Sequence, residues 1–175
     1  MHIVLVGMMG VGKSTIGKEL SKSLDIPFLD IDDLIEKSES KTISKIFEQS
    51  GESYFRKREM EITLKALMQE NKAIISTGGG AIMNKVIRNN ILNRSISVWL
   101  KLDTSSIMSR IGKNNKRPLI LQNTKVEIEK ILEDRLIYYA MAQIHIECKG
   151  KNIKNCANQI IKEIGTGSYG NVFQI

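Results

Sequence analysis

The stretch of sequence that decides the fold is His2-Ile3-Val4-Leu5-Val6-Gly7-Met8-Met9-Gly10-Val11-Gly12-Lys13-Ser14. Its first five residues form a largely apolar run that is typical of a buried strand. An amphipathic helix is expected to follow over 14–24. The glycine-rich residues between the two fit the pattern GxxxxGK[ST] of a phosphate-binding loop. The setting suits such a loop, because it connects a strand to the N-terminus of a helix.

This loop predicts that the chain binds a nucleoside triphosphate. Glycines allow the backbone to curl so that several N–H groups face phosphate oxygens. The helix N-terminus adds a partial positive charge at the same point. Lys13 is expected to reach the β- and γ-phosphates, and Ser14 is expected to ligate Mg²⁺.

Strand-like and helix-like patterns alternate along the rest of the chain. Further strands are expected over 27–29, 73–75, 96–102 and 144–147, with helices between them. A helix capped by Thr42 is expected to end at Gly51, where a longer helix follows to about residue 70. This alternation predicts an α/β fold, in which a mostly parallel sheet lies between two layers of helices.

Length and composition narrow the class of protein. With 175 residues, of which 42% are hydrophobic and 26% charged, the chain is expected to form one globular domain. No apolar run approaches the roughly 20 residues of a membrane span. The N-terminus passes directly into a strand, unlike a signal peptide. We therefore expect a cytoplasmic protein with no membrane partner.

The charge balance is basic, with 26 Lys+Arg against 19 Asp+Glu and a net charge of +7. Such a charge suits nucleic-acid binding and equally an enzyme of anionic substrates, because positive clefts steer phosphates and carboxylates. Aromatic residues make up only 5% and no run of five like charges occurs, so we expect no nucleic-acid partner. The two cysteines, Cys148 and Cys156, are expected to be inert thiols in a reducing compartment.

Three carboxylates occur where the second expected strand ends, in Phe28-Leu29-Asp30-Ile31-Asp32-Asp33. Because side chains alternate along a strand, Asp30 and Asp32 are expected to point one way and Asp33 the other. The carboxyl ends of parallel strands line the ligand crevice. Two carboxylates there suit Mg²⁺ coordination and the orientation of an acceptor hydroxyl. The alternative is a helix N-terminus capped by Asp32 or Asp33.

Two arginines are candidate ligand clamps. In the helix expected over 124–142, Arg135 falls on the apolar face. A buried guanidinium is costly unless an anion meets it, so a ligand carboxylate or phosphate would suit Arg135, and an internal salt bridge is the alternative. Glu59 lies three residues after Arg56 and can orient it, although such a spacing is also that of an ordinary helical ion pair.

Two glycine-containing stretches suggest ligand contact. Gly78-Gly79-Gly80 costs backbone entropy, so we interpret it as a place where a ligand approaches the backbone closely, with a plain turn as the alternative. The polar stretch 112–116 is expected to be a mobile loop, and Arg117 at its end can reach a transferring phosphoryl group. An ordinary solvated loop is the alternative there.

In their order and spacing, these residues resemble the shikimate kinase family. The resemblance runs from Ile3 to about Ile164. It rests on the phosphate-binding loop, Phe28-Leu29-Asp30-Ile31-Asp32, Ile46-Phe47, Gly51-Glu52, Phe55-Arg56, Glu59, Gly78-Gly79-Gly80, Arg117-Pro118-Leu119, and Arg135 with Tyr138. It implies ATP-dependent phosphorylation of the 3-hydroxyl of shikimate in chorismate and aromatic amino acid biosynthesis. Mg²⁺ is the implied cofactor, and shikimate and ATP are the implied small-molecule partners.

The resemblance also implies a domain plan. The family fold is a three-layer P-loop kinase with a five-stranded parallel sheet, here a single domain over 1–164. An acceptor-binding subdomain is placed at about 31–60 and a lid at about 111–123. The tail over 165–175 has no family role, and we expect it to be flexible. We expect the protein to be a monomer.

The resemblance also implies a role for each candidate residue. Asp32 would bind the acceptor hydroxyl as the candidate base, and Lys13 and Arg117 would complete the catalytic set. Asp30 would support the metal beside Ser14. The implied ATP-binding residues are Gly10, Val11, Gly12, Lys13, Ser14, Thr15, Arg110, Arg117 and Asn152. The implied shikimate-binding residues are Asp32, Phe47, Phe55, Arg56, Glu59, Gly78, Gly79, Gly80 and Arg135, of which the two arginines clamp the carboxylate.

One departure and two rival functions stay open. The family often has an asparagine-proline pair before its last helix to contact adenine, whereas the chain has Asn152 followed by Ile153. One rival is another small-molecule kinase of this fold, for gluconate or a nucleoside monophosphate. The other is a nucleotide-dependent regulatory module without enzymatic function.

Overall fold

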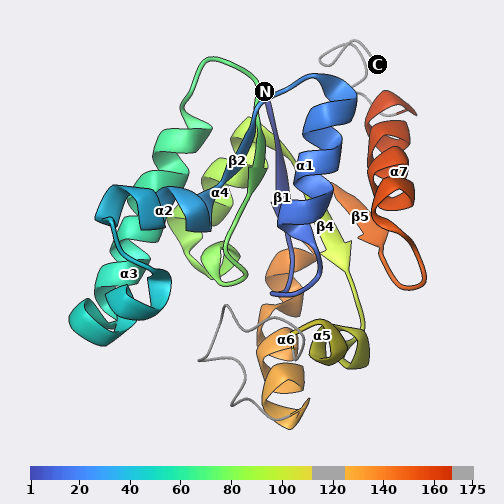
Figure 1. Ribbon diagram of the computed structural model, residues 1–175. Coiled ribbons are helices and arrows are strands. Elements are labelled where there is room, and N and C mark those ends of the chain that lie inside the picture. The colour runs from blue at the N-terminus through green and yellow to red at the C-terminus, as the bar shows by residue number, and fades with distance from the viewer. Residues whose placement is uncertain (112–124, 167–175) are drawn as a thin grey trace.

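The computed structural model describes residues 1–111 and 125–166, and its centre is a five-stranded parallel sheet (Figure 1). The strand order is β2-β3-β1-β4-β5. The strands are β1 (His2–Val6), β2 (Phe28–Asp30), β3 (Ile74–Ser76), β4 (Ser95–Lys101) and β5 (Ile144–Glu147). The expected fold class is confirmed, and the strand bounds differ from the expected ones by at most one residue at each end.

Helices cover both faces of the sheet. They are α1 (Lys13–Leu24), α2 (Ile31–Glu39), α3 (Ile43–Leu67), α4 (Lys85–Arg94), α5 (Thr104–Ile111), α6 (Lys125–Tyr139) and α7 (Ile153–Thr166), with a 3-10 turn η1 (Ala81–Met83). Figure 1 shows α1 and α7 side by side on one face, and α3 and α4 on the other. Since α7 runs to Thr166, the first two residues of the expected tail are helical, and 167–175 lie outside the described residues.

The central strand explains the uninterrupted apolar run of the opening sequence. β1 pairs with β3 through Ile3 and Ile74, and with β4 through Leu5 and Val98. Every residue of β1 is buried, because neighbouring strands flank it and helices cover both of its faces. A strand buried on both faces reads as continuous hydrophobic sequence rather than as an alternating pattern. β1 therefore fixes the position of the loop that leaves its carboxyl end.

All five strands run in parallel, so their carboxyl ends share one edge of the sheet. In Figure 1 this edge points downward, with α5 and α6 below it and α2 and α3 to one side. Loops after parallel strands converge at such an edge, which is where ligands bind in open α/β sheets.

The predicted break at Gly51 is confirmed. Gly51 has φ 77° and ψ 173°, which interrupts the helical geometry of α3. Thr42 caps the start of this helix, because its side chain accepts a hydrogen bond from the Lys45 N–H at 3.4 Å. Behind the break, α3 is tied to α2: Arg58 Nε donates to Glu39 at 2.6 Å, and the Tyr54 hydroxyl donates to the same carboxylate at 2.8 Å.

The predicted alternation of the carboxylates is wrong, because the extended backbone does not continue past Asp30. β2 ends at Asp30 and α2 begins at Ile31, so Asp32 and Asp33 lie in the first turn of a helix. The capping residue is Asp30, whose Oδ1 accepts a hydrogen bond from the Asp32 N–H at 3.1 Å. The two following acids still face different surroundings. Asp32 is half-buried and lines a cavity, whereas Asp33 is exposed.

Within residues 1–111 and 125–166, no helix combines the length and the apolar character that crossing a bilayer requires.

Candidate active site

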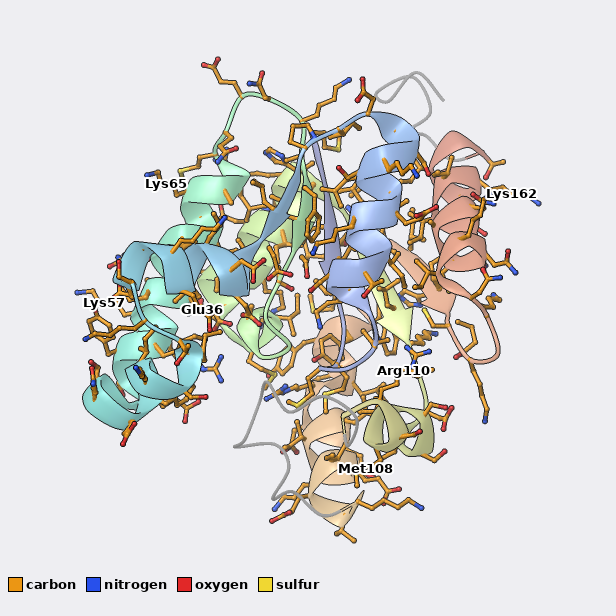
Figure 2. The ribbon with its side chains drawn as sticks, viewed as in Figure 1. Glu36, Lys57, Lys65, Met108, Arg110 and Lys162 are labelled. Carbon is orange, nitrogen blue, oxygen red and sulfur yellow. The ribbon has the colours of Figure 1, made fainter. Side chains whose placement is uncertain are left out.

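A cavity of about 580 Å³ lies at the carboxyl edge of the sheet. Its walls come from five places: the loop after β1 with the start of α1, the start of α2, the end of β3, the end of α5, and the segment that leads from β5 into α7. The lining residues are Met9, Gly10, Val11, Gly12, Lys13, Ser14, Thr15, Ile16, Asp32, Ser76, Thr77, Arg110, Cys148, Lys151, Ile153 and Cys156. The labelled Arg110 in Figure 2 marks the side of this edge near α5 and α7.

The loop after β1 has the curled backbone that its glycines predict. Gly7, Gly10 and Gly12 have φ values of 138°, 77° and 106°, a region that side-chain-bearing residues rarely adopt. Lys13 begins α1, and its ammonium donates hydrogen bonds to the carbonyls of Gly7 at 2.8 Å and Met8 at 3.0 Å. A buried cation of this kind beside a helix N-terminus is the electrostatic setting that phosphate oxygens require.

Two oxygen donors fit a hard divalent cation. The Ser14 hydroxyl donates a hydrogen bond to Asp30 Oδ2 at 2.5 Å, so the hydroxyl and carboxylate predicted for Mg²⁺ are neighbours. Mg²⁺ takes oxygen ligands and usually keeps only one or two protein carboxylates, the remaining positions going to water and substrate phosphates. Accordingly, the described part of the chain has no cluster of three or more His, Cys, Asp or Glu residues that could enclose a metal.

The three glycines after β3 lie against several of the candidate site residues. A Cβ atom on Gly78 would overlap Glu59 Oε1 and lie 3.2 Å from Asp32 Oδ1. A Cβ on Gly80 would lie 2.9 Å from the guanidinium of Arg56, closer than side chains tolerate. None of the three glycines has a positive φ, so space rather than backbone geometry excludes side chains. Close approach to this backbone was predicted, but here it is protein side chains that approach it.

Gly79 completes the arrangement on the opposite side of the same loop. A Cβ there would lie 3.1 Å from the Met9 backbone nitrogen and 3.6 Å from Arg135 Nη1. The glycine loop therefore packs directly on the phosphate-binding loop. Through it the structure gathers Asp32, Arg56, Glu59 and Arg135 around one short backbone segment.

Glu59 is a deeply buried carboxylate, with 2% of its side chain exposed. Its Oε2 accepts a hydrogen bond from Arg56 Nη1 at 2.8 Å, and Arg56 also reaches Glu52 at 3.1 Å. Its Oε1 has no hydrogen-bond partner within the described residues. Burial raises the pKa of Glu59, and the attraction of Arg56 opposes this shift only in part. The expected ion pair thus exists, and it holds Arg56 against the glycine loop.

Arg135 lies on α6 and is half-buried, as its place on the apolar face predicts. Its Nη1 makes a weak contact with the sulfur of Met8, at 3.9 Å. In residues 1–111 and 125–166, no carboxylate lies within 4.0 Å of its guanidinium, so the internal salt bridge is not found there. A half-buried guanidinium in this state is suited to an external anion.

The sequence profile described as "Shikimate kinase" matches residues 9–165. A shikimate kinase of Bartonella henselae is 39% identical over 163 residues, which are 93% of this chain and 77% of that protein. The chain belongs to the shikimate kinase family. The shikimate kinase of Acinetobacter baumannii, solved in complex with shikimate, is 33% identical, has a TM-score of 0.88, and matches over 93% of this chain and 92% of its own. The Aquifex aeolicus shikimate kinase is 33% identical and has a TM-score of 0.83, and the match covers 97% of this chain and 100% of that one.

Family membership makes this protein an enzyme of the phosphotransferase class. It is an ATP-dependent kinase whose acceptor is shikimate, acting in aromatic amino acid biosynthesis. The rival assignments to another acceptor or to a regulatory module are set aside by the same observations.

Of the other residues expected to bind ATP, Arg110 lies at the cavity and Asn152 does not. Arg110 lines the cavity and its Nη1 donates to the Val11 carbonyl at 2.9 Å, beside the phosphate-binding loop. Asn152 does not line the cavity: it is exposed, and its side chain accepts a hydrogen bond from the Asn155 N–H at 2.8 Å at the start of α7. Its neighbours Lys151 and Ile153 line the cavity instead. Arg117 and the expected lid lie outside the described residues, apart from Ile111 at the end of α5.

An aromatic pair supports the acceptor side. The rings of Phe47 and Phe55 lie 4.7 Å apart between centroids, and the Arg56 guanidinium carbon lies 5.2 Å from the Phe55 ring centroid. Phe55 is buried and Phe47 is half-buried. They form an apolar support beneath the guanidinium, which limits the positions that Arg56 can take.

Sequence reasoning missed several cavity residues that follow strands. Ser76 and Thr77 lie at the end of β3, and the Thr77 hydroxyl donates to the Leu5 carbonyl at 3.1 Å. Cys148 follows β5, and Cys156 lies on the facing side of α7. Burial and the neighbouring Cys156 raise the pKa of the Cys148 thiol to about 12, so it stays neutral. The rule that strand carboxyl ends line the crevice could have identified all but Cys156.

We expect Glu59→Gln to raise the free energy of unfolding at pH 7. The folded-state pKa of Glu59 lies above its ordinary value of 4.5, so ionised Glu59 opposes folding at neutral pH. The advantage of glutamine should vanish below pH 4.5, where the carboxyl is protonated in both the folded and the unfolded protein. Urea unfolding of both proteins at pH 7 and pH 4 measures the difference. A variant less stable than the wild type at pH 7 would contradict this reading.

Proposed function

We propose that this shikimate kinase transfers the γ-phosphoryl group of ATP specifically to the 3-hydroxyl of shikimate, with Asp32 orienting that hydroxyl. One observation carries the assignment. The glycine loop Gly78–Gly80 abuts Asp32, Arg56, Glu59 and Arg135 and packs on the phosphate-binding loop. A carboxylate for a hydroxyl, two guanidinium groups for an acid and a phosphate cradle thus meet at one place, as phosphorylation of a hydroxy acid requires.

The carboxylate of shikimate would be bound by Arg56 and Arg135. Glu59 and Glu52 already neutralise part of the Arg56 charge, but 38% of its side chain is exposed and its remaining N–H groups can reach a ligand. Arg135 has no carboxylate among the described residues within 4.0 Å, so it supplies most of the unmatched positive charge. A carboxylate held between two guanidinium groups would fix the acceptor's orientation as well as its position.

Asp32 is the residue that would face the reacting hydroxyl. It is half-buried at the cavity wall, next to Gly78 and beside the phosphate-binding loop. The hydroxyl would donate a hydrogen bond to this carboxylate and give up its proton as the bond from oxygen to the γ-phosphorus forms. The bond from that phosphorus to the bridging oxygen breaks, and ADP leaves. Positioning contributes more than covalent chemistry to such a transfer.

Charge on the transferring group would be spread over several partners. Lys13 lies at the centre of the phosphate cradle, and Arg117 is proposed to join it from the lid over about 111–123. Ser14 and Asp30 would hold Mg²⁺, which when bound neutralises phosphate charge. Arg110 and the residues around Cys148 would receive the nucleoside.

We also propose that the protein acts as a cytoplasmic monomer with small-molecule partners only. The net charge of +7 then serves the binding of two anionic substrates rather than of nucleic acid.

Shikimate should accelerate ADP release from Mg-ATP by several orders of magnitude. A coupled assay with shikimate, gluconate or AMP as acceptor tests the substrate, and NMR of the product locates the phosphate. Lys13→Ala serves as the inactive control, because removing the ammonium deletes the charge that meets the phosphates. An equal rate with gluconate, or a Lys13→Ala rate near that of the wild type, would argue against the assignment.

Asp32→Asn should lower kcat by about 10²- to 10⁴-fold, the usual contribution of a positioned base, with a small change in the KM for ATP. Asp33→Asn is the matched control, because it makes the same change one residue further on, at an exposed position outside the cavity. Steady-state kinetics compares them. If both variants lose activity equally, the role of Asp32 as the base is wrong.

Arg135→Ala should raise the KM for shikimate about 10- to 100-fold and leave the KM for ATP within about twofold, because a hydrogen-bonded charge pair is lost on one substrate only. Varying each substrate at saturation of the other gives both constants. Equal effects on the two substrates would contradict the clamp.

A further inference from the structure

Tyr139 makes a contact that no role assigned so far explains. It is the last residue of α6, and its side chain is fully buried. Its hydroxyl donates a hydrogen bond to the Gly79 carbonyl at 2.5 Å and lies 3.8 Å from the sulfur of Met8. One phenol group therefore touches the glycine loop and the phosphate-binding loop at the same point.

The ring of Tyr139 is held in place from behind. It stacks on Trp99 of β4 with centroids 5.9 Å apart, and His145 of β5 packs edge-on against the same indole at 5.1 Å. Two strands of the sheet thus fix where the hydroxyl sits. Burial raises the pKa of Tyr139, so the hydroxyl keeps its proton and acts as a donor at physiological pH.

Gly79 is the point where three parts of the active site meet. The position of a Cβ on Gly79 lies 3.1 Å from the Met9 nitrogen and 3.6 Å from Arg135 Nη1. Arg135 precedes Tyr139 by one helical turn on α6, and both side chains approach the sulfur of Met8. A shift of the Gly79 carbonyl would therefore change the distance between the acceptor residues and the phosphate-binding loop.

We propose that Tyr139 is a positioning residue, whose hydroxyl fixes the Gly79 carbonyl and thereby aligns the shikimate site with the transferring phosphoryl group. The inference rests on the proposed function. Without the hydroxyl, both substrates still find their binding groups, but the distance between them is no longer fixed. A misplacement of about 1 Å at a reacting centre can cost 10²-fold in rate. Poor alignment also admits water as a competing acceptor for the phosphoryl group.

Tyr139→Phe tests this, since it removes one oxygen and keeps the ring on Trp99. We expect kcat with shikimate to fall about 10- to 100-fold, while the KM for ATP stays within about twofold. We also expect the ratio of ADP released to shikimate phosphate formed to rise above one. Tyr138→Phe is the matched control on the same helix. Its ring packs on Arg88, with the guanidinium carbon 4.4 Å from the ring centroid, and phenylalanine preserves that contact.

Gly79→Ala tests the same contact from its other side. It keeps the Tyr139 hydroxyl but pushes the loop from the Met9 backbone, so it should also uncouple ADP release from product formation. Thermal unfolding of each variant, with kinetics well below the midpoint, separates alignment from loss of fold.

Wild-type constants and a ratio of one in Tyr139→Phe would overturn the inference while leaving the proposed function intact. A uniform loss of activity with an unchanged ratio would also overturn it, because that is the mark of a merely structural residue. A wild-type protein without shikimate-dependent ADP release would overturn the proposed function itself, and this inference with it.

Discussion

The tight contact between the glycine loop and its neighbours is the constraint on which the site depends. Gly78, Gly79 and Gly80 have no side chains, and side chains from three helices lie close to the positions that their Cβ atoms would take. α3 contributes Arg56 and Glu59, α2 contributes Asp32, and α6 contributes Arg135. The parallel sheet supplies the platform, since β1 and β3 are neighbours and their following loops must lie against each other. A single side chain on this segment would push apart groups that the proposed reaction needs side by side.

Electrostatics in the site follow from burial as much as from charge. Burial raises the pKa of Glu59 and so makes its ionised form costly, and the neighbouring Arg56 offsets that cost only in part. Lys13 is also buried, but two carbonyls of its own loop satisfy it. In the proposed acceptor site, burial of the Glu59 carboxylate is therefore unfavourable. In the proposed phosphate site, hydrogen bonds to backbone carbonyls stabilise the buried Lys13 ammonium. Strained groups and groups with perturbed pKa values are commonly found where ligands bind.

Much of this could be predicted from sequence because the deciding signals are local. The phosphate-binding loop, the Gly51 break and the parallel sheet each follow from short patterns with a known physical cause. The failures concern boundaries and long-range contacts. β2 ends at Asp30, so Asp32 lies in a helix rather than on extended backbone. The Asn152 side chain accepts a hydrogen bond from the Asn155 N–H at the start of α7, and Asn152 does not line the cavity. Nothing local to Tyr139 indicates a hydrogen bond to a residue sixty positions away.

The half-buried guanidinium of Arg135 has a consequence for discrimination between acceptors. The folded protein has already removed part of its water, and no carboxylate of the described chain within 4.0 Å replaces it. A neutral polyol of the same shape would complete that dehydration and offer no anion in return. Sites built on unmatched polar groups reject such analogues far more strongly than apolar pockets reject a missing methylene. In the proposed complex, selectivity would therefore arise mainly because an alcohol without a carboxylate desolvates Arg135 and gives it no anionic partner.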